Sequence, residues 1–244
     1  MGNTLYFVIF NIKNKYEGTI LSYLWTLVPI VMQFVIMSFI TKQVFNQAND
    51  SSIRLFVSLL LWSFFREVTS NSSNLISFKW HHAKNYFIKL TSIIRIEFLS
   101  SVLIFGINLF FTLSYFALRG TYEYDILGLI YYILLGFLIT YIISIFLFVL
   151  GSVYKDAFHL WNNFLSLLFW SVPIVYSSSL VPHKYLTILK LNPLFSVFSG
   201  LGDALNGEGI TYDFNLLFFF GLIIMIVLCE SLVERLRNSM VLRL

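Results

Sequence analysis

The chain has 244 residues, of which 58% are hydrophobic and only 11% are charged, and its mean hydropathy is +0.82. Soluble domains average about 45–50% apolar and about 25% charged residues, so this composition excludes an ordinary soluble domain and indicates an integral membrane protein. The net charge of +4 comes from Lys and Arg scattered between apolar blocks. Because nucleic-acid-binding proteins gather such residues into a stripe, we expect no nucleic-acid partner.

Long stretches without charged side chains mark the candidate spans, because a helix needs about 20 apolar residues to cross roughly 30 Å of hydrocarbon. We predict an all-α membrane protein with six transmembrane helices in one domain, residues 1–244. The predicted spans are residues 20–41, 53–76, 96–118, 126–150, 157–179 and 214–232. The apolar run at the amino end is too short to cross, so residues 1–16 are predicted to form a helix lying in the membrane interface.

The distribution of Lys and Arg predicts the orientation of the chain. An even number of spans places both termini on one side, and the segments on that side carry more Lys and Arg than the opposite segments. Cytoplasmic loops are enriched in these residues. We therefore expect a multi-pass protein of the cytoplasmic (inner) membrane with both termini in the cytoplasm.

Two segments between spans are not ordinary loops. Residues 79–90 carry apolar side chains at helical spacing with Lys mostly elsewhere on the wheel, which predicts a cytoplasmic amphipathic helix. Its apolar positions are Trp80, Ala83, Phe87 and Leu90. Residues 180–213 mix apolar patches with Pro and Gly breakers, and they are predicted to enter the membrane and return as a re-entrant hairpin.

Arg66 and Glu67 interrupt the second predicted span near its middle. Adjacent residues of a helix point in different directions, so these two side chains do not simply neutralise each other, and each needs another partner or water. Charged residues inside spans often mark function. Two interpretations stay open, which are an interhelical ion pair and a water-filled path or gate.

The chain lacks the common nucleotide-binding and catalytic motifs. It has no G-x-x-x-x-G-K-[ST], H-E-x-x-H, G-x-S-x-G or C-x-x-C, and its single Cys and four His show no metal-ligand spacing. We therefore expect no enzyme active site, no metal site and no bound cofactor. Any ATP must be bound by another chain.

One stretch offers a remote alternative. Gly200-Leu201-Gly202-Asp203 resembles the GxGD motif of intramembrane aspartyl proteases, and Tyr124-Asp125 or Tyr212-Asp213 could supply the second aspartate. Asp203 lies in a Gly-rich polar segment, the other two aspartates flank predicted spans, and the Pro-Ala-Leu element of that family is missing. These features count against a protease.

Several short motifs carry a family resemblance when they are taken in chain order. They are Asn11-Ile12-Lys13-Asn14-Lys15-Tyr16, Leu24-Trp25 with Pro29, Leu61-Trp62-Ser63-Phe64-Phe65, Val153-Tyr154-Lys155-Asp156, Phe169-Trp170-Ser171-Val172-Pro173-Ile174-Val175-Tyr176 and Leu191-Asn192-Pro193-Leu194. Together they resemble the ABC-2 type permeases that export polysaccharides, including O-antigen and teichoic acid. The chain departs from that pattern at Ser22, where Gly is usual, and at Tyr86-Phe87-Ile88, where Phe-Pro is usual.

The resemblance implies a permease subunit that has no catalytic activity of its own. Two copies would form a channel, and two cytoplasmic ATPase subunits, which bind ATP and Mg²⁺, would dock beneath it. Residues 79–90 are similar to the coupling helix of these permeases, and the resemblance nominates as ATPase contacts Trp80, Ala83, Lys84, Phe87 and Leu90. The first and fifth helices are similar to the pore-lining pair, which nominates as glycan contacts Tyr23, Trp25, Trp161, Trp170 and Tyr176.

The resemblance also implies a substrate class, a lipid-linked polysaccharide similar to O-antigen and carried on undecaprenyl pyrophosphate, as in lipopolysaccharide biosynthesis. Lys13 and Lys15 are candidates to attract that phosphate, and they are equally candidates for topology determinants. Export of teichoic acid, or of a drug or lipid, remains as an alternative.

Overall fold

The computed structural model describes residues 2–16, 24–44, 52–83, 89–119, 124–154, 156–207 and 216–236, and every regular element within these ranges is a helix. The α-helices are α1 (Gly2–Tyr16), α2 (Leu24–Val44), α3 (Ser52–Ala83), α4 (Leu90–Arg119), α5 (Ile126–Val153), α6 (Ala157–Ser171), α7 (His183–Leu189), α8 (Pro193–Leu205) and α9 (Leu216–Arg235). The predicted all-α class is confirmed for this part of the chain.

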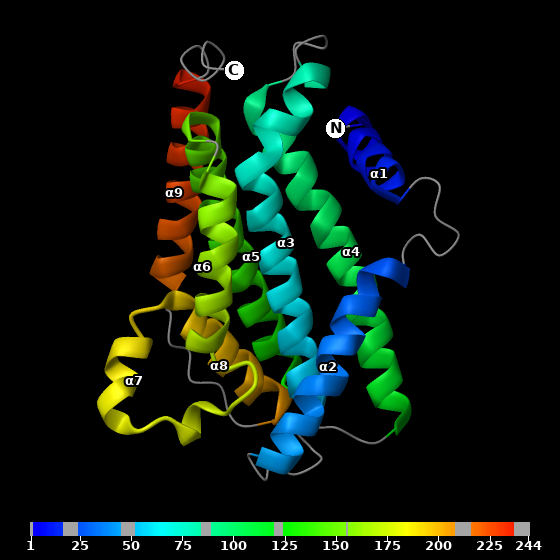
Figure 1. Cartoon of the computed structure of the whole chain (residues 1–244), viewed down its shortest axis with the longest axis vertical. Helices are drawn as coiled ribbons and strands as arrows, with labels where there is room; N and C mark the ends of the chain where they lie inside the picture. The colour runs from blue at the N-terminus through cyan, green and yellow to red at the C-terminus, as the bar shows by residue number, and fades with distance from the viewer. Residues whose placement is uncertain are drawn as a thin grey trace.

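Helices α2 to α6 and α9 lie alongside one another and alternate in direction along the chain (Figure 1). The end of α3, the start of α4, the end of α5 and the end of α9 gather at one end of the bundle, which is uppermost in Figure 1 and which we call the upper end. Among the described residues, two helices are long and apolar enough to cross a membrane, Leu90–Leu118 and Ile126–Val153. Leu27–Thr41 is a shorter apolar helix, and the number of spans stays a prediction.

Helices α3 and α5 form the centre of the bundle. Helix α3 contacts α2, α4, α5, α6 and α8, and α5 contacts α3, α4, α6, α8 and α9. The α3 and α5 backbones touch, because a Cβ atom at Gly151 would lie 1.9 Å from the carbonyl oxygen of Ser73. Small residues permit such close helix crossings in membrane proteins.

Helix α6 ends earlier than the predicted span of residues 157–179. It stops at Ser171, and Val172 is extended with φ −112° and ψ 144°. Pro173 explains this, because proline disfavours the helical conformation in the residue before it and has no N–H to donate. The chain continues through bends to a short 3₁₀ helix, Ser178–Leu180.

The predicted re-entrant region folds, in its described part, into α7 and α8. Asn192 caps α8 by accepting a hydrogen bond from the Leu194 N–H at 3.1 Å, and Pro193 occupies the first turn. Most of α8 is buried, and it packs against α5 and α3. Helix α7 has no buried residue and lies beside the bundle (Figure 1).

The predicted amphipathic helix of residues 79–90 is not a separate element in the described residues. Helix α3 has no Pro or Gly to interrupt it and continues through residue 83. Leu90 begins α4, and residues 84–88 lie outside the described residues. The single predicted helix is therefore divided between the end of one long helix and the start of the next.

Candidate functional site: a polar stripe on α3

A row of polar side chains follows one face of α3, and we call it the α3 polar stripe. Its members are Ser63, Arg66, Glu67, Ser70, Asn71 and Asn74. Their spacing of three or four residues keeps them on one side of the helix. All of them are exposed or half-buried, whereas the intervening residues 64, 65, 68, 69, 72 and 73 are buried. If α3 crosses a membrane, as the sequence predicts, this face needs water or polar neighbours beside it.

A buried carboxylate of α4 joins the stripe to α1. Glu97 is only 4% exposed, and it accepts hydrogen bonds from the side-chain amides of Asn71 at 3.0 Å and Asn11 at 3.2 Å. The Asn11 amide also donates to Ser100 Oγ at 3.1 Å. Burying a carboxylate is costly unless hydrogen bonds compensate it, so these amides hold α1, α3 and α4 together.

Helix α6 meets the other edge of the stripe. The Ser70 hydroxyl donates to Asn162 Oδ1 at 2.9 Å. One residue earlier on each helix, the Trp161 indole N–H donates to Thr69 Oγ1 at 3.0 Å. Because Trp161 is half-buried and held in this way, its ring faces α3.

A small cavity of about 20 Å³ lies between α2, α3 and α4, next to the stripe. Its lining residues are Ile30, Leu60, Ser63, Phe64, Glu67, Ser101, Ile104, Phe105 and Asn108. The Ser101 hydroxyl is buried and has no hydrogen-bond partner among the residues that the structure describes. A cavity of this size holds about one water molecule, and the polar side chains in its lining, Ser63, Glu67, Ser101 and Asn108, can serve as hydrogen-bond partners for it.

Arg66 and Glu67 diverge as the sequence predicts. Glu67 is half-buried and lines the cavity on the α4 side. Arg66 is exposed, and its guanidinium forms no ion pair with any residue that the structure describes. For Arg66, the described residues therefore do not provide the interhelical ion pair that was one interpretation.

The predicted glycan contacts on α6 do not share one face. Trp161 and Trp170 are nine residues apart, which on a helix of 3.6 residues per turn places them on opposite sides. Trp161 faces α3, whereas Trp170 is 62% exposed. Tyr176 is half-buried, and its hydroxyl donates to the Trp170 carbonyl oxygen at 3.4 Å.

Other predicted site residues are placed only in part. Lys13 is exposed on α1, and Leu90 is 1% exposed. Leu90 therefore packs inside this chain and does not contribute to an exposed docking face. Tyr23, Lys84 and Phe87 lie outside the described residues, and the structure describes the backbone but not the side chains of Lys15, Trp25, Trp80 and Ala83.

The protease-like stretch has structural explanations that need no catalysis. A Cβ atom at Gly200 would lie 1.9 Å from the Tyr132 ring, so glycine is required where α8 crosses α5. The Asp125 carboxylate accepts a hydrogen bond from the Gly128 N–H at 3.0 Å and caps α5. Asp213 lies outside the described residues.

Sequence reasoning identified Arg66 and Glu67 but missed the rest of the stripe. A hydropathy window averages polar residues with the buried apolar residues between them, and the stripe disappears in that average. The signal that could have found it is the helical period of the polar residues from Ser63 to Asn74. The link from Asn11 to Glu97 had no local signal, because 86 residues separate the two.

Comparison with known proteins gives a consistent picture. No protein-family model matches the chain. Among curated proteins, it is 28% identical over 226 residues to an O-antigen export system permease protein RfbA of Klebsiella pneumoniae. It is 27% identical over 228 residues to a second protein of that name from the same organism. Each alignment covers 89% of this chain and 85% of the relative.

Proposed function

We propose that the chain is the transmembrane subunit of an ABC-2 type polysaccharide exporter. The chain is similar to two O-antigen export permeases, and this similarity confirms the resemblance drawn from its motifs. Its cargo is a lipid-linked polysaccharide, such as a glycan on undecaprenyl pyrophosphate, that crosses the cytoplasmic membrane. The structural observation that supports this proposal is the α3 polar stripe. Polar side chains on the open face of a membrane helix fit a conduit for a hydrated or hydroxyl-rich cargo.

The proposed topology has six spans, formed by α2, α3, α4, α5, α6 and α9. Their alternating directions fit such a topology, and the end of α3, the start of α4, the end of α5 and the start of α6 lie at the same end as the last turn of α9 (Figure 1). We assign this upper end to the cytoplasm because the basic residues favour it. Helix α1 then lies at the cytoplasmic interface, where exposed Lys13 would meet lipid phosphate.

The proposed assembly contains two copies of this chain and two ATPase subunits. This chain performs no catalysis and binds no cofactor; ATP and Mg²⁺ belong to the ATPase. The ATPase would dock at residues 79–88. The conduit would lie where the α3 polar stripe and the outward face of α6 meet a second copy, with exposed Trp170 as a sugar contact.

The stripe can be tested directly by export. The chain and its ATPase are expressed in a strain from which both genes are deleted, and surface polysaccharide is measured on gels. We expect R66L and N74L to lower export at least about fivefold, because each removes a polar contact from the conduit. The matched control is F110A, which truncates an apolar side chain that is 67% exposed on α4.

Each alternative predicts a different outcome. Normal surface polysaccharide in the deletion strain, or a chain that does not co-purify with an ATPase, would contradict the proposal. Stimulation of the ATPase by small amphiphiles and not by the glycan lipid would identify a drug or lipid exporter. Loss of teichoic acid alone would identify that polymer as the cargo, and loss of membrane-substrate cleavage in D203A would identify a protease.

A further inference from the structure

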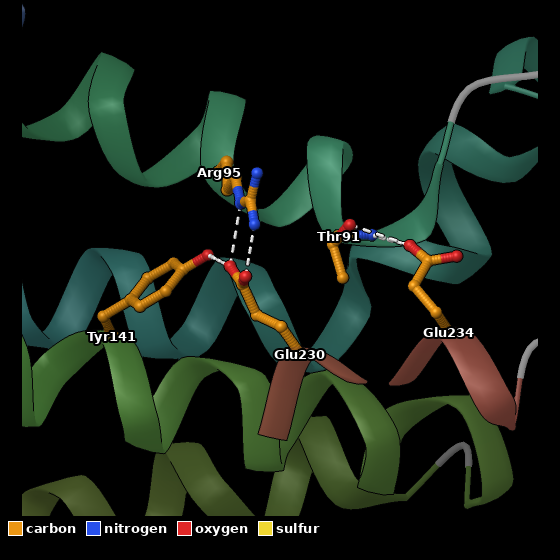
Figure 2. Close-up of polar contacts among 5 residues, drawn as sticks. All are labelled: Thr91, Arg95, Tyr141, Glu230 and Glu234. Carbon is orange, nitrogen blue, oxygen red and sulfur yellow. Dashed lines mark hydrogen bonds and ion pairs between the residues drawn. The ribbon is translucent and has the colours of Figure 1, made fainter. Parts of the chain in front are cut away.

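At the upper end of the bundle, side chains of α9 form hydrogen bonds and an ion pair with the first two turns of α4 (Figure 2). Glu234 Oε1 accepts hydrogen bonds from the Thr91 N–H at 3.1 Å and from the Thr91 hydroxyl at 2.7 Å. One turn further along, Arg95 binds Glu230 through two of its nitrogens, with Nε 2.8 Å from Oε1. The Tyr141 hydroxyl of α5 donates to the same Glu230 oxygen at 2.5 Å. We call these five residues the α4–α9 clamp.

The spacing of the clamp follows from helix geometry. Thr91 and Arg95 are four residues apart on α4, and Glu230 and Glu234 are four residues apart on α9, so each pair lies on one face. The chain directions are opposite, and Thr91 therefore meets Glu234 while Arg95 meets Glu230 (Figure 2). Glu234 supplies a cap to α4 from another helix, because the first N–H groups of a helix have no partner within it.

An apolar cluster lies beside the clamp and is distinct from the main core. Its buried members are Leu75, Leu90, Ile93, Ile94, Tyr141, Ile145, Phe148 and Val233. They come from the end of α3, the start of α4, the end of α5 and the end of α9. The upper end is therefore packed as its own unit, and Leu90 is anchored inside it.

The place of this unit in the chain points to its role. Helix α4 begins at Leu90, with one residue, Lys89, between it and residues 84–88, and Leu90 is already buried in the cluster. A displacement of the preceding segment must therefore move the first turn of α4, and the clamp makes α9 and α5 move with it. Packed elements joined by satisfied polar networks shift together as discrete units.

We propose that Glu230 and Glu234 are positioning residues that transmit the motion of the ATPase-docking segment to α9 and α5. This inference rests on the proposed function, because it requires an ATPase at residues 79–88. Glu234 fixes the start of α4, and Glu230 fixes Arg95 and Tyr141 together, so both residues act through these partners. Their loss uncouples ATP hydrolysis from export without releasing the ATPase.

The test uses the full complex in its native membrane and in proteoliposomes. For E230Q and E234Q we measure ATPase co-purification, the rate of ATP hydrolysis and polysaccharide export. We expect both variants to retain the ATPase and to hydrolyse ATP, while export per ATP hydrolysed falls at least about fivefold. The double variant R95E/E230R, which exchanges the two charges, should restore most of the coupling lost in E230Q. The control is R235Q, which changes an exposed charge next to Glu234 on the same helix.

The outcomes separate this inference from the proposed function. If the unmodified chain binds no ATPase, the proposed function fails. If it binds the ATPase and exports, but E230Q and E234Q export as much per ATP as R235Q, the clamp proposal is overturned. If E230Q lowers the amount of protein in the membrane, R95E/E230R decides the question. Recovery of both amount and coupling supports the proposal, and recovery of the amount alone overturns it.

Discussion

The buried carboxylate of Glu97 links three helices, α1, α3 and α4. Its two oxygens accept from Asn11 and Asn71, so its removal would take one hydrogen-bond acceptor from each of these two amides. We expect E97A to lower the free energy of unfolding by about 1–3 kcal/mol, the cost of stranding buried polar groups. The measurement is thermal or denaturant unfolding of the purified chain in detergent.

Two controls make the Glu97 measurement specific. L99A truncates a neighbouring side chain of α4 that is 42% exposed, and it should change stability little. E97Q keeps an acceptor oxygen and should cost less than E97A. Equal stability of E97A and L99A would show that the hydrogen bonds linking α1 to the bundle contribute nothing to the free energy of unfolding.

At the scale of the elements, glycine determines how closely α8 crosses α5. A methyl group at Gly200 would overlap the Tyr132 ring, whereas nothing lies within 4 Å of a Cβ atom at Gly221. We expect G200A to destabilise the protein by about 1–3 kcal/mol, the usual cost of overpacking a core. G221A should be neutral or stabilising, because alanine favours a helix more than glycine does. Parallel unfolding of the two variants checks this, and equal effects would contradict the crossing.

Prediction from sequence succeeded for helices whose bounds follow from hydropathy. It failed where tertiary contacts determine where a helix begins or which way a side chain points. The apolar length of residues 126–150 predicted a helix that the structure places at Ile126–Val153. The helix predicted over residues 79–90 was divided instead, because Leu90 is buried in a cluster that also contains residues of two distant helices, among them Tyr141, Phe148 and Val233. Trp161 and Trp170 were grouped because both lie on the helix that resembles a pore-lining helix, and they lie on opposite sides of α6. Glu230 and Glu234 gave no signal, since their partners are on α4 and α5.

At the scale of the whole molecule, the proposed topology places Lys89 inside the cell and Lys184 outside. Both residues are exposed in the structure. In a C229S background, K184C should react with a membrane-impermeant maleimide in intact spheroplasts, and K89C should react only after the membrane is opened. Labelling is followed by the mass shift on a gel. The reverse pattern would invert the topology and remove residues 79–88 from reach of a cytoplasmic ATPase.

The contact of Gly151 with the Ser73 carbonyl oxygen limits how the proposed exporter can work. Two helices in main-chain contact cannot slide past each other without a clash, so α3 and α5 behave as one stiff body. Since α4 and α9 are fastened to the same body, force applied from the cytoplasm would tilt this body as a whole. The width of the conduit would then change at the edges of this body, along α2 and α6 and at the interface with a second subunit.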